Sequence, residues 1–287
     1  MTITLTRKLA LGAAILALCA SASATDVAAH IGYHNPGLDN SPGLPSADVS
    51  ASHATNVQLD SSNLPVQPHG GYSSYMWLNA SSAATGELAT ATDLAASGSV
   101  VASASWHDTI VNSGAAAQNY TFHFALSDGK LEVGGWTGDE NLRDFRASYT
   151  AEVLVNGVAV WHAEQGLSLD GNGFHQSASG ANIGSGTFSS TGARGTYELA
   201  GYTGTLNLGP VAAGQSLSVS YVLTSRGYWD DPAGCAYECG RVTATIGDPL
   251  GVNSARITAA VPEPETYAML LAGLGLLGWA ARRRQRA

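Results

Sequence analysis

The two cysteines that lie close together are the residues best suited to covalent chemistry. Cys235 and Cys239 are separated by three residues, whereas the third cysteine, Cys19, lies near the N-terminus. In an oxidising compartment two neighbouring cysteines form a disulfide, although closing so small a loop gives a modest gain in stability. A metal site would need two further ligands nearby. We therefore predict a Cys235–Cys239 disulfide, with a metal site or a reactive thiol pair as the alternative.

A second candidate for chemistry is an oxygen-rich loop. Asp170-Gly171-Asn172-Gly173 places acidic and amide oxygens at alternate positions, as the start of a calcium-binding loop does. The full loop pattern needs another Asp or Asn two positions later, where this chain has Phe174. A turn in a glycine-rich loop is therefore the favoured interpretation. Asp170 and Asn172 stay as the calcium candidates, and no other cofactor is expected.

The sequence contains none of the short motifs that mark common active sites. Its eight histidines include no H-E-x-x-H metal motif, and neither a G-x-S-x-G nucleophile turn nor a G-x-x-x-x-G-K-[ST] phosphate loop occurs. Two carboxylates brought together from distant strands, as in glycoside hydrolysis, would leave no local signature. We therefore assign no catalytic residue and expect that the protein is not an enzyme.

The alternation of apolar and polar residues along the chain predicts the β-strands that position the candidate residues. Three segments each have one apolar face, formed by Val100, Ala102, Ala104, Trp106 and Ile110, by Tyr120, Phe122, Phe124 and Leu126, and by Leu217, Val219, Tyr221 and Leu223. His107 and His123 fall on the polar faces. Asn156-Gly157 lies between two further alternating segments and predicts a hairpin, because both of its residues accept positive φ.

The fold class that these strands predict is all-β. Between residues 85 and 260 there is no convincing amphipathic helix and no repeat of fixed period. We expect an antiparallel β-sandwich of jelly-roll type there. Residues 25–84 are rich in Pro, Asn, Ser and His, so we expect a loosely ordered lead-in with one strand near residues 72–78. Core packing is expected for most of the tryptophans, and outward-facing ones would suit sugar binding.

The N-terminal segment, residues 1–24, has the pattern of a secretory signal peptide. Arg7 and Lys8 precede an apolar run, and the segment ends in the cleavage pattern Ala22-Ser23-Ala24. We predict cleavage after Ala24. A short N-terminal membrane helix is the alternative.

The C-terminal segment, residues 261–287, combines three features in a fixed order. Pro262-Glu263-Pro264 precedes an uncharged stretch at residues 267–281, and the basic cluster Arg282, Arg283, Arg284 and Arg286 follows. We predict a transmembrane helix over 267–281, which at about 1.5 Å per residue is short for a bilayer core of about 30 Å. The arginines should remain cytoplasmic and leave the preceding domain outside the inner membrane.

This arrangement resembles the PEP-CTERM protein-sorting segment, which is also labelled an ice-binding protein C-terminal domain. The resemblance covers residues 261–286 and implies a Gram-negative bacterium that makes a biofilm or exopolysaccharide. It also implies an exosortase, a membrane transpeptidase-like enzyme, as the partner that recognises Pro262, Glu263 and Pro264. A plain C-terminal anchor is the alternative, and it would keep the same topology.

The charge balance of the chain limits its partners. Charged residues make up only 12% of the sequence and the formal net charge is −9, which argues against binding to nucleic acid. We expect an exported protein that is anchored in the inner membrane, with its domain in the periplasm, until it is processed. It would then act at the cell surface or in the extracellular matrix as a non-enzymatic component associated with exopolysaccharide. A carbohydrate-binding or carbohydrate-active β-sandwich is the alternative.

Overall fold

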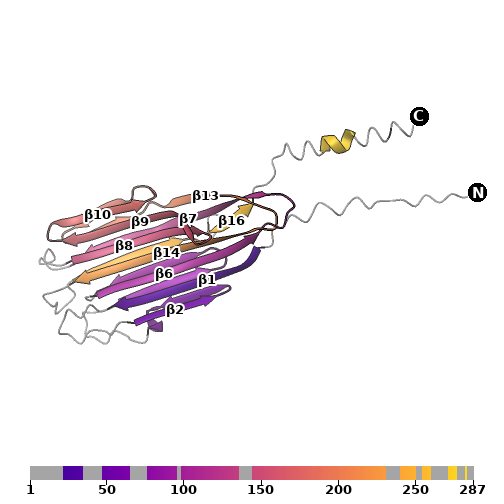
Figure 1. Ribbon diagram of the computed structural model, residues 1–287. Coiled ribbons are helices and arrows are strands. Elements are labelled where there is room, and N and C mark those ends of the chain that lie inside the picture. The colour runs from indigo at the N-terminus through magenta and orange to yellow at the C-terminus, as the bar shows by residue number, and fades with distance from the viewer. Residues whose placement is uncertain are drawn as a thin grey trace, which may run out of the picture.

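Antiparallel strands make up almost all of the computed structural model of this chain (Figure 1). The structure describes residues 22–34, 47–64, 76–95, 98–135, 144–230, 240–249, 254–259, 271–276 and 282. These residues form sixteen strands, β1 to β16, in two sheets, one short 3-10 helix, η1, at Ser61–Asn63, and a helical stretch at residues 271–276. The predicted all-β fold class is therefore confirmed.

The first sheet has seven strands, which lie side by side in Figure 1. Their order is β10 (Gly173–Gly180), β9 (Val158–Asp170), β8 (Asp144–Val155), β14 (Ser216–Asp230), β6 (Gly98–Val111), β1 (Ala22–His34) and β2 (Ala47–His53). Every neighbouring pair is antiparallel. The central strand, β14, thus lies between β6 and β8, which are both far from it in the sequence.

The second sheet has nine strands and is organised around the long strand β7 (Gln118–Gly134). Its main path runs β11 (Thr187–Thr191), β12 (Arg194–Glu198), β7, β15 (Arg241–Asp248), β5 (Leu88–Leu94), β4 (Met76–Ala83) and β3 (Asn56–Asp60). The first half of β7 pairs instead with β13 (Tyr202–Val211) and with β16 (Arg256–Ala259). Strand β7 therefore joins the body of the sheet to the last strand before the C-terminal segment.

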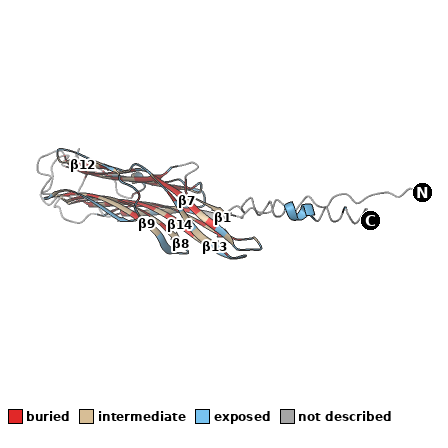
Figure 2. Ribbon diagram, turned by 90° about the horizontal axis from the view of Figure 1, so that it is seen from above, coloured by how far each residue is buried: buried red, intermediate tan, exposed pale blue. Residues whose placement is uncertain are grey.

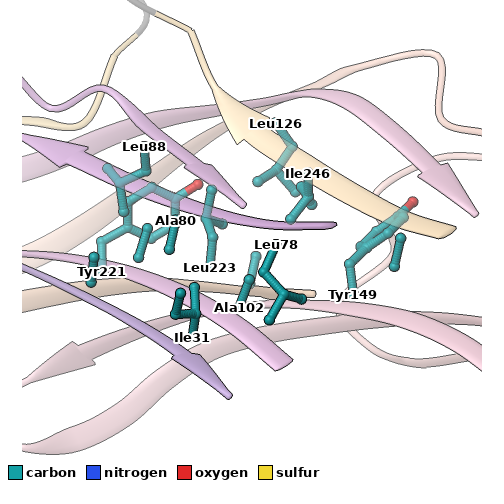
Figure 3. Close-up of a cluster of buried hydrophobic side chains, with 14 of the residues drawn as sticks. Ile31, Leu78, Ala80, Leu88, Ala102, Leu126, Tyr149, Tyr221, Leu223 and Ile246 are labelled. Carbon is teal, nitrogen blue, oxygen red and sulfur yellow. The ribbon is translucent and has the colours of Figure 1, made fainter. Parts of the chain in front are cut away.

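The two sheets form two layers with the buried side chains between them (Figure 2). All three predicted apolar faces point into this core, because every one of their residues is buried. Figure 3 shows part of the core, in which Ile31 and Leu223 from the first sheet lie near Leu78 and Ile246 from the second. Burial of alternate residues on both sheets is what holds the layers together.

Aromatic rings bridge the two layers beside the strand β9. Trp161 of β9 makes an edge contact with Phe124 of β7, with ring centroids 4.7 Å apart. Trp161 also stacks on Tyr202 of β13 at 5.9 Å, and Phe124 lies 5.5 Å from Phe122. Such ring pairs add to the stability from area burial. Trp106 is only 3% exposed, which confirms its predicted place in the core.

The hairpin predicted at Asn156-Gly157 is also confirmed. Strands β8 and β9 pair on either side of it, and Asn156 and Gly157 have φ values of 51° and 78°. The Asn156 side chain accepts a hydrogen bond from the backbone N–H of Ser218 at 3.0 Å. This contact ties the turn to the neighbouring strand β14.

The prediction of a loosely ordered lead-in at residues 25–84 is wrong for the residues described. This part of the chain contributes β1 and β2 to the first sheet and β3 and β4 to the second, so it supplies strands to both layers. Strand β1 pairs with β6 along most of its length, and its inward residues Val27, Ala29, Ile31 and Tyr33 are buried. The expected strand near residues 72–78 corresponds to β4, which begins at Met76. The jelly-roll connection is not confirmed by the strand orders and stays a prediction.

Candidate functional site

The loop proposed for calcium is a tight turn between β9 and β10. Asp170 Oδ1 accepts the backbone N–H of Asn172 at 2.7 Å and lies 3.1 Å from His175 Nε2. Hydrogen bonds from Asn172 and His175 lower the pKa of Asp170. The turn interpretation accounts for these contacts, and among the described residues no group of three metal-binding side chains is brought together. Calcium at Asp170 and Asn172 stays an untested prediction.

The outer face of the nine-stranded sheet carries two carboxylates that could suggest a hydrolase. Asp93 of β5 and Glu132 of β7 both lie opposite Thr243 of the strand between them, and Trp77 lies opposite Asp93 on the other side. Trp77 is 48% exposed, whereas Trp106 and Trp229 are buried and Trp161 is partly buried. The described part of the sheet therefore presents a row with one outward tryptophan and two carboxylates.

Both carboxylates are held by arginines from adjacent strands. Arg241 donates to both oxygens of Asp93, with Nε 2.8 Å from Oδ1, and Arg194 donates to Oε1 of Glu132 from Nε at 2.8 Å. Lys130 lies 3.3 Å from the other oxygen of Glu132. These charge-assisted contacts link β15 to β5 and β12 to β7 on the outer face of the sheet.

The electrostatics of this row do not favour acid catalysis. Burial raises the pKa of Glu132, but the hydrogen bonds and charges of Arg194 and Lys130 outweigh burial and leave the pKa below its usual value. A general acid in glycoside hydrolysis needs a raised pKa so that it still carries its proton. The row is therefore better explained as ion pairs that stabilise the sheet.

The two histidines expected on polar strand faces lie there, and each contacts hydroxyl groups. His107 Nδ1 is 2.8 Å from Ser220 Oγ on the adjacent strand, and His123 Nε2 is 3.0 Å from Thr258 Oγ1 of β16. Burial and the nearby Arg256 lower the pKa of His123, so it is neutral at pH 7. Neither histidine contacts a nucleophile and a carboxylate together, as a catalytic triad would require.

A buried carboxyl lies where the last strands of the domain meet. Asp248, at the end of β15, is 1% exposed, and its Oδ2 accepts the backbone N–H of Ala125 at 3.0 Å. Burial raises the pKa of Asp248 to about 8, against the opposing effects of the Ala125 amide, the neighbouring Tyr221 hydroxyl and the charge of Arg256. Asp248 is therefore largely protonated at pH 7. It connects β7, β14 and β15 close to β16, which leads into the C-terminal segment.

The sequence reasoning missed this group because Gly247-Asp248-Pro249 has the composition of an ordinary turn. It also missed the ion pairs of Asp93 and Glu132, since their arginines come from strands 148 and 62 residues away. The one local signal was the position of Asp248 directly after the alternating apolar residues of β15. A carboxyl at the end of a buried strand is a candidate for a perturbed pKa.

Several predicted site residues lie outside the described residues. These are Cys235 and Cys239, the motif Pro262, Glu263 and Pro264, and the arginines Arg283, Arg284 and Arg286. The predicted disulfide and the predicted transmembrane helix over 267–281 are therefore not established. Only 271–276 and Arg282 of the C-terminal segment are described, as helix. In the described parts of the chain, no helix has the length and apolar character needed to cross a membrane.

The predicted cleavage after Ala24 falls within β1. The pairing of β1 with β6 shifts its register between Ser23 and Asp26, and from Asp26 to His34 it continues without a further shift. A chain that starts at Thr25 would thus keep the regular part of the strand. The cleavage itself stays a prediction.

Comparison with known proteins identifies the C-terminal segment. Residues 260–284 match the family model of the PEP-CTERM protein-sorting motif, which lies directly after the last strand, β16. No curated protein matches the chain. The class defined by these observations is a protein with an all-β domain followed by a PEP-CTERM sorting motif. The motif implies export and recognition by an exosortase in the membrane.

Proposed function

We propose that this chain is an exported, non-enzymatic component of the cell surface or extracellular matrix that associates with exopolysaccharide. The observation that carries the proposal is the sorting motif at residues 260–284, which implies processing by an exosortase. In this proposal the predicted helix at 267–281 holds the chain in the inner membrane with its β-domain in the periplasm. The exosortase then cuts near Pro262 and releases the domain toward the surface.

The β-domain supports a structural rather than a catalytic role. The two carboxylates on the outer face of the nine-stranded sheet are both occupied by arginines. Stable antiparallel sheets with a small-residue, acidic surface suit a protein that remains folded outside the cell. The predicted Cys235–Cys239 disulfide would add to that stability, and calcium would be able to bridge surface carboxylates to an acidic sugar.

The alternative is a carbohydrate-active domain, which the exposed Trp77 beside Asp93 favours. Incubation with a panel of glycans, with and without calcium, distinguishes the two functions. The assay uses the exported chain recovered from the cells that produce it. The structural proposal expects no release of reducing ends from any glycan. Turnover of a glycan that is lost in Asp93→Asn or Glu132→Gln would overturn it.

Retention in the matrix tests the association with exopolysaccharide. The proposal expects the processed chain to fractionate with the extracellular matrix of its host and to be released when the polysaccharide is digested. A chain found entirely in the soluble medium, or one that remains with the cells after the polysaccharide is removed, would contradict the association.

A further inference from the structure

The outer face of the seven-stranded sheet contains a hollow of about 420 Å³ toward one end of its strands. Strands β2, β1, β6, β14 and β8 form its floor and walls, in the order in which they lie in Figure 1. The polar side chains that line it include His34, Asp48, Ser99, Arg146, Ser148, Arg226 and Tyr228. Two of the few basic residues of an acidic chain therefore line one hollow.

The hollow exists because small residues lie between the long side chains. Arg226 is aligned across the sheet with Val101 on one side and Ser148 on the other, and Val101 is aligned in turn with Gly32. At Gly32 an added Cβ would lie 2.0 Å from the Asp48 carboxylate, so glycine allows this carboxylate to lean over the strand. The side chain of Arg226 therefore extends above a floor of small residues.

Arg226 is exposed, and none of the described residues forms an ion pair or hydrogen bond with its side chain. Arg146, Arg194 and Arg241 each contact a carboxylate, so Arg226 differs from these arginines of the sheets. Arg146 lies diagonally across the ladder from Arg226, because Arg146 is aligned with Tyr228, two residues further along β14. Side chains at diagonal positions are within reach of each other. One anion can therefore contact the guanidinium of Arg226 and the guanidinium of Arg146, which also binds Asp144.

The remaining groups of the hollow suit a sugar better than an inorganic anion. The guanidinium of Arg146 lies 5.5 Å from the centre of the Tyr228 ring, which fixes the ring at the edge of the hollow. Asp48 contacts His30 at 3.3 Å and offers a carboxylate acceptor on the opposite side. A sugar acid needs these three elements, namely a guanidinium for its carboxylate, an acceptor for its hydroxyls and an apolar surface for its ring.

The same face continues beyond the hollow in a way that suits a polymer. A second hollow of about 390 Å³ is lined by small and polar residues that include His30, Ser50, Ser52, Ser103 and Ser105. It shares the strands β1, β2, β6 and β14 with the first hollow. Consecutive sugar units of a chain can therefore contact consecutive positions along these strands.

We propose that this face, centred on Arg226, binds an acidic polysaccharide whose sugar units carry carboxylates. The inference rests on the proposed function and adds to it the site and the class of glycan. The carboxylate of one unit lies between Arg226 and Arg146, the ring packs against Tyr228, and Asp48 and the serine hydroxyls bind the sugar hydroxyls.

Affinity electrophoresis of the exported chain through gels that contain polygalacturonate tests the site. Gels with neutral dextran and with polyglutamate serve as probes of sugar without charge and of charge without sugar. We expect retardation in polygalacturonate alone. The apparent dissociation constant should rise about tenfold in Arg226→Gln and in Tyr228→Ala, whereas Tyr228→Phe should bind like the wild type because the ring remains.

Lys130→Gln is the matched control, since it removes one positive charge from the outer face of the other sheet. It should change the dissociation constant less than twofold, and a cooperative thermal unfolding transition in each variant confirms that the sheets remain folded. If the wild type binds polygalacturonate and Arg226→Gln binds equally well, the site is wrong while the proposed function stands. If the wild type binds polyglutamate as tightly, or binds no acidic polysaccharide at all, the ligand class is wrong. The fractionation of the chain with the host matrix then tests the proposed function separately.

Discussion

The buried carboxyl of Asp248 makes the stability of the β-domain depend on pH in an unusual direction. Its pKa is about 8 in the folded protein, compared with an ordinary value of 3.8. Above pH 4 the unfolded chain releases this proton while the folded chain keeps it up to about pH 8. The folded state therefore binds more protons in this window, and its stability falls as the pH rises.

The size of the effect follows from the two pKa values. Each unit of difference in pKa corresponds to about 1.4 kcal/mol, so the contribution of Asp248 should fall by roughly 3–4 kcal/mol between pH 5 and pH 8. In Asp248→Asn the side chain has nearly the same shape, still accepts the Ala125 N–H and no longer titrates. The free energy of unfolding of this variant, relative to wild type, should therefore increase by that amount over the same range.

Urea unfolding of the exported chain at pH 5, 6, 7 and 8 measures this difference. Asp60→Asn is the control, because hydrogen bonds from Ser62 lower the pKa of Asp60, so it is already charged throughout this range. Its stability curve should run parallel to that of the wild type. Parallel curves for Asp248→Asn and wild type would show that Asp248 titrates normally, and the reasoning from burial would then be refuted.

Three further predictions concern single contacts. Arg194→Ala leaves Lys130 as the partner of the buried Glu132 and should lower the free energy of unfolding by about 2 kcal/mol. A loss below about 0.5 kcal/mol in urea unfolding would contradict the stabilising role of the Arg194–Glu132 pair. Gly157→Ala should cost about 1 kcal/mol in the same assay, because the φ of 78° is strained for alanine although a Cβ there would meet no atom within 4 Å. Thiol labelling of the denatured exported chain should find neither Cys235 nor Cys239 free, and stoichiometric labelling of both would disprove the disulfide.

Alternation along the sequence was enough to predict the inward faces of the strands that carry large apolar residues. Phe122, Phe124 and Tyr221 alternate with polar residues, and all three are buried. The pattern failed at β1, where Val27, Ala29, Ile31 and Tyr33 also alternate but lie between turn-rich segments and include small side chains. Small residues contribute little hydrophobic signal, so the composition around them dominated the prediction.

The arrangement of the strands, in contrast, depends on contacts between residues far apart in the chain. Strand β14 lies between β6 and β8, and no local pattern in 216–230 specifies these neighbours. The hollow around Arg226 has the same origin, because Asp48, Arg226 and Arg146 come from three strands, β2, β14 and β8, that the folded sheet brings to one face. The sorting motif could be predicted fully, since its recognition depends on consecutive residues and not on tertiary structure.

Processing at the sorting motif is the central claim, and intact mass spectrometry tests it most directly. The chain is recovered from its native host and from a strain of that host without exosortase. In the native host we predict a mature chain that begins at Thr25 and ends near Pro262, without Arg282–Arg286. In the strain without exosortase the tail should remain and the chain should stay with the inner membrane. A surface-exposed chain of the native host that still carries Arg282–Arg286 would contradict the account.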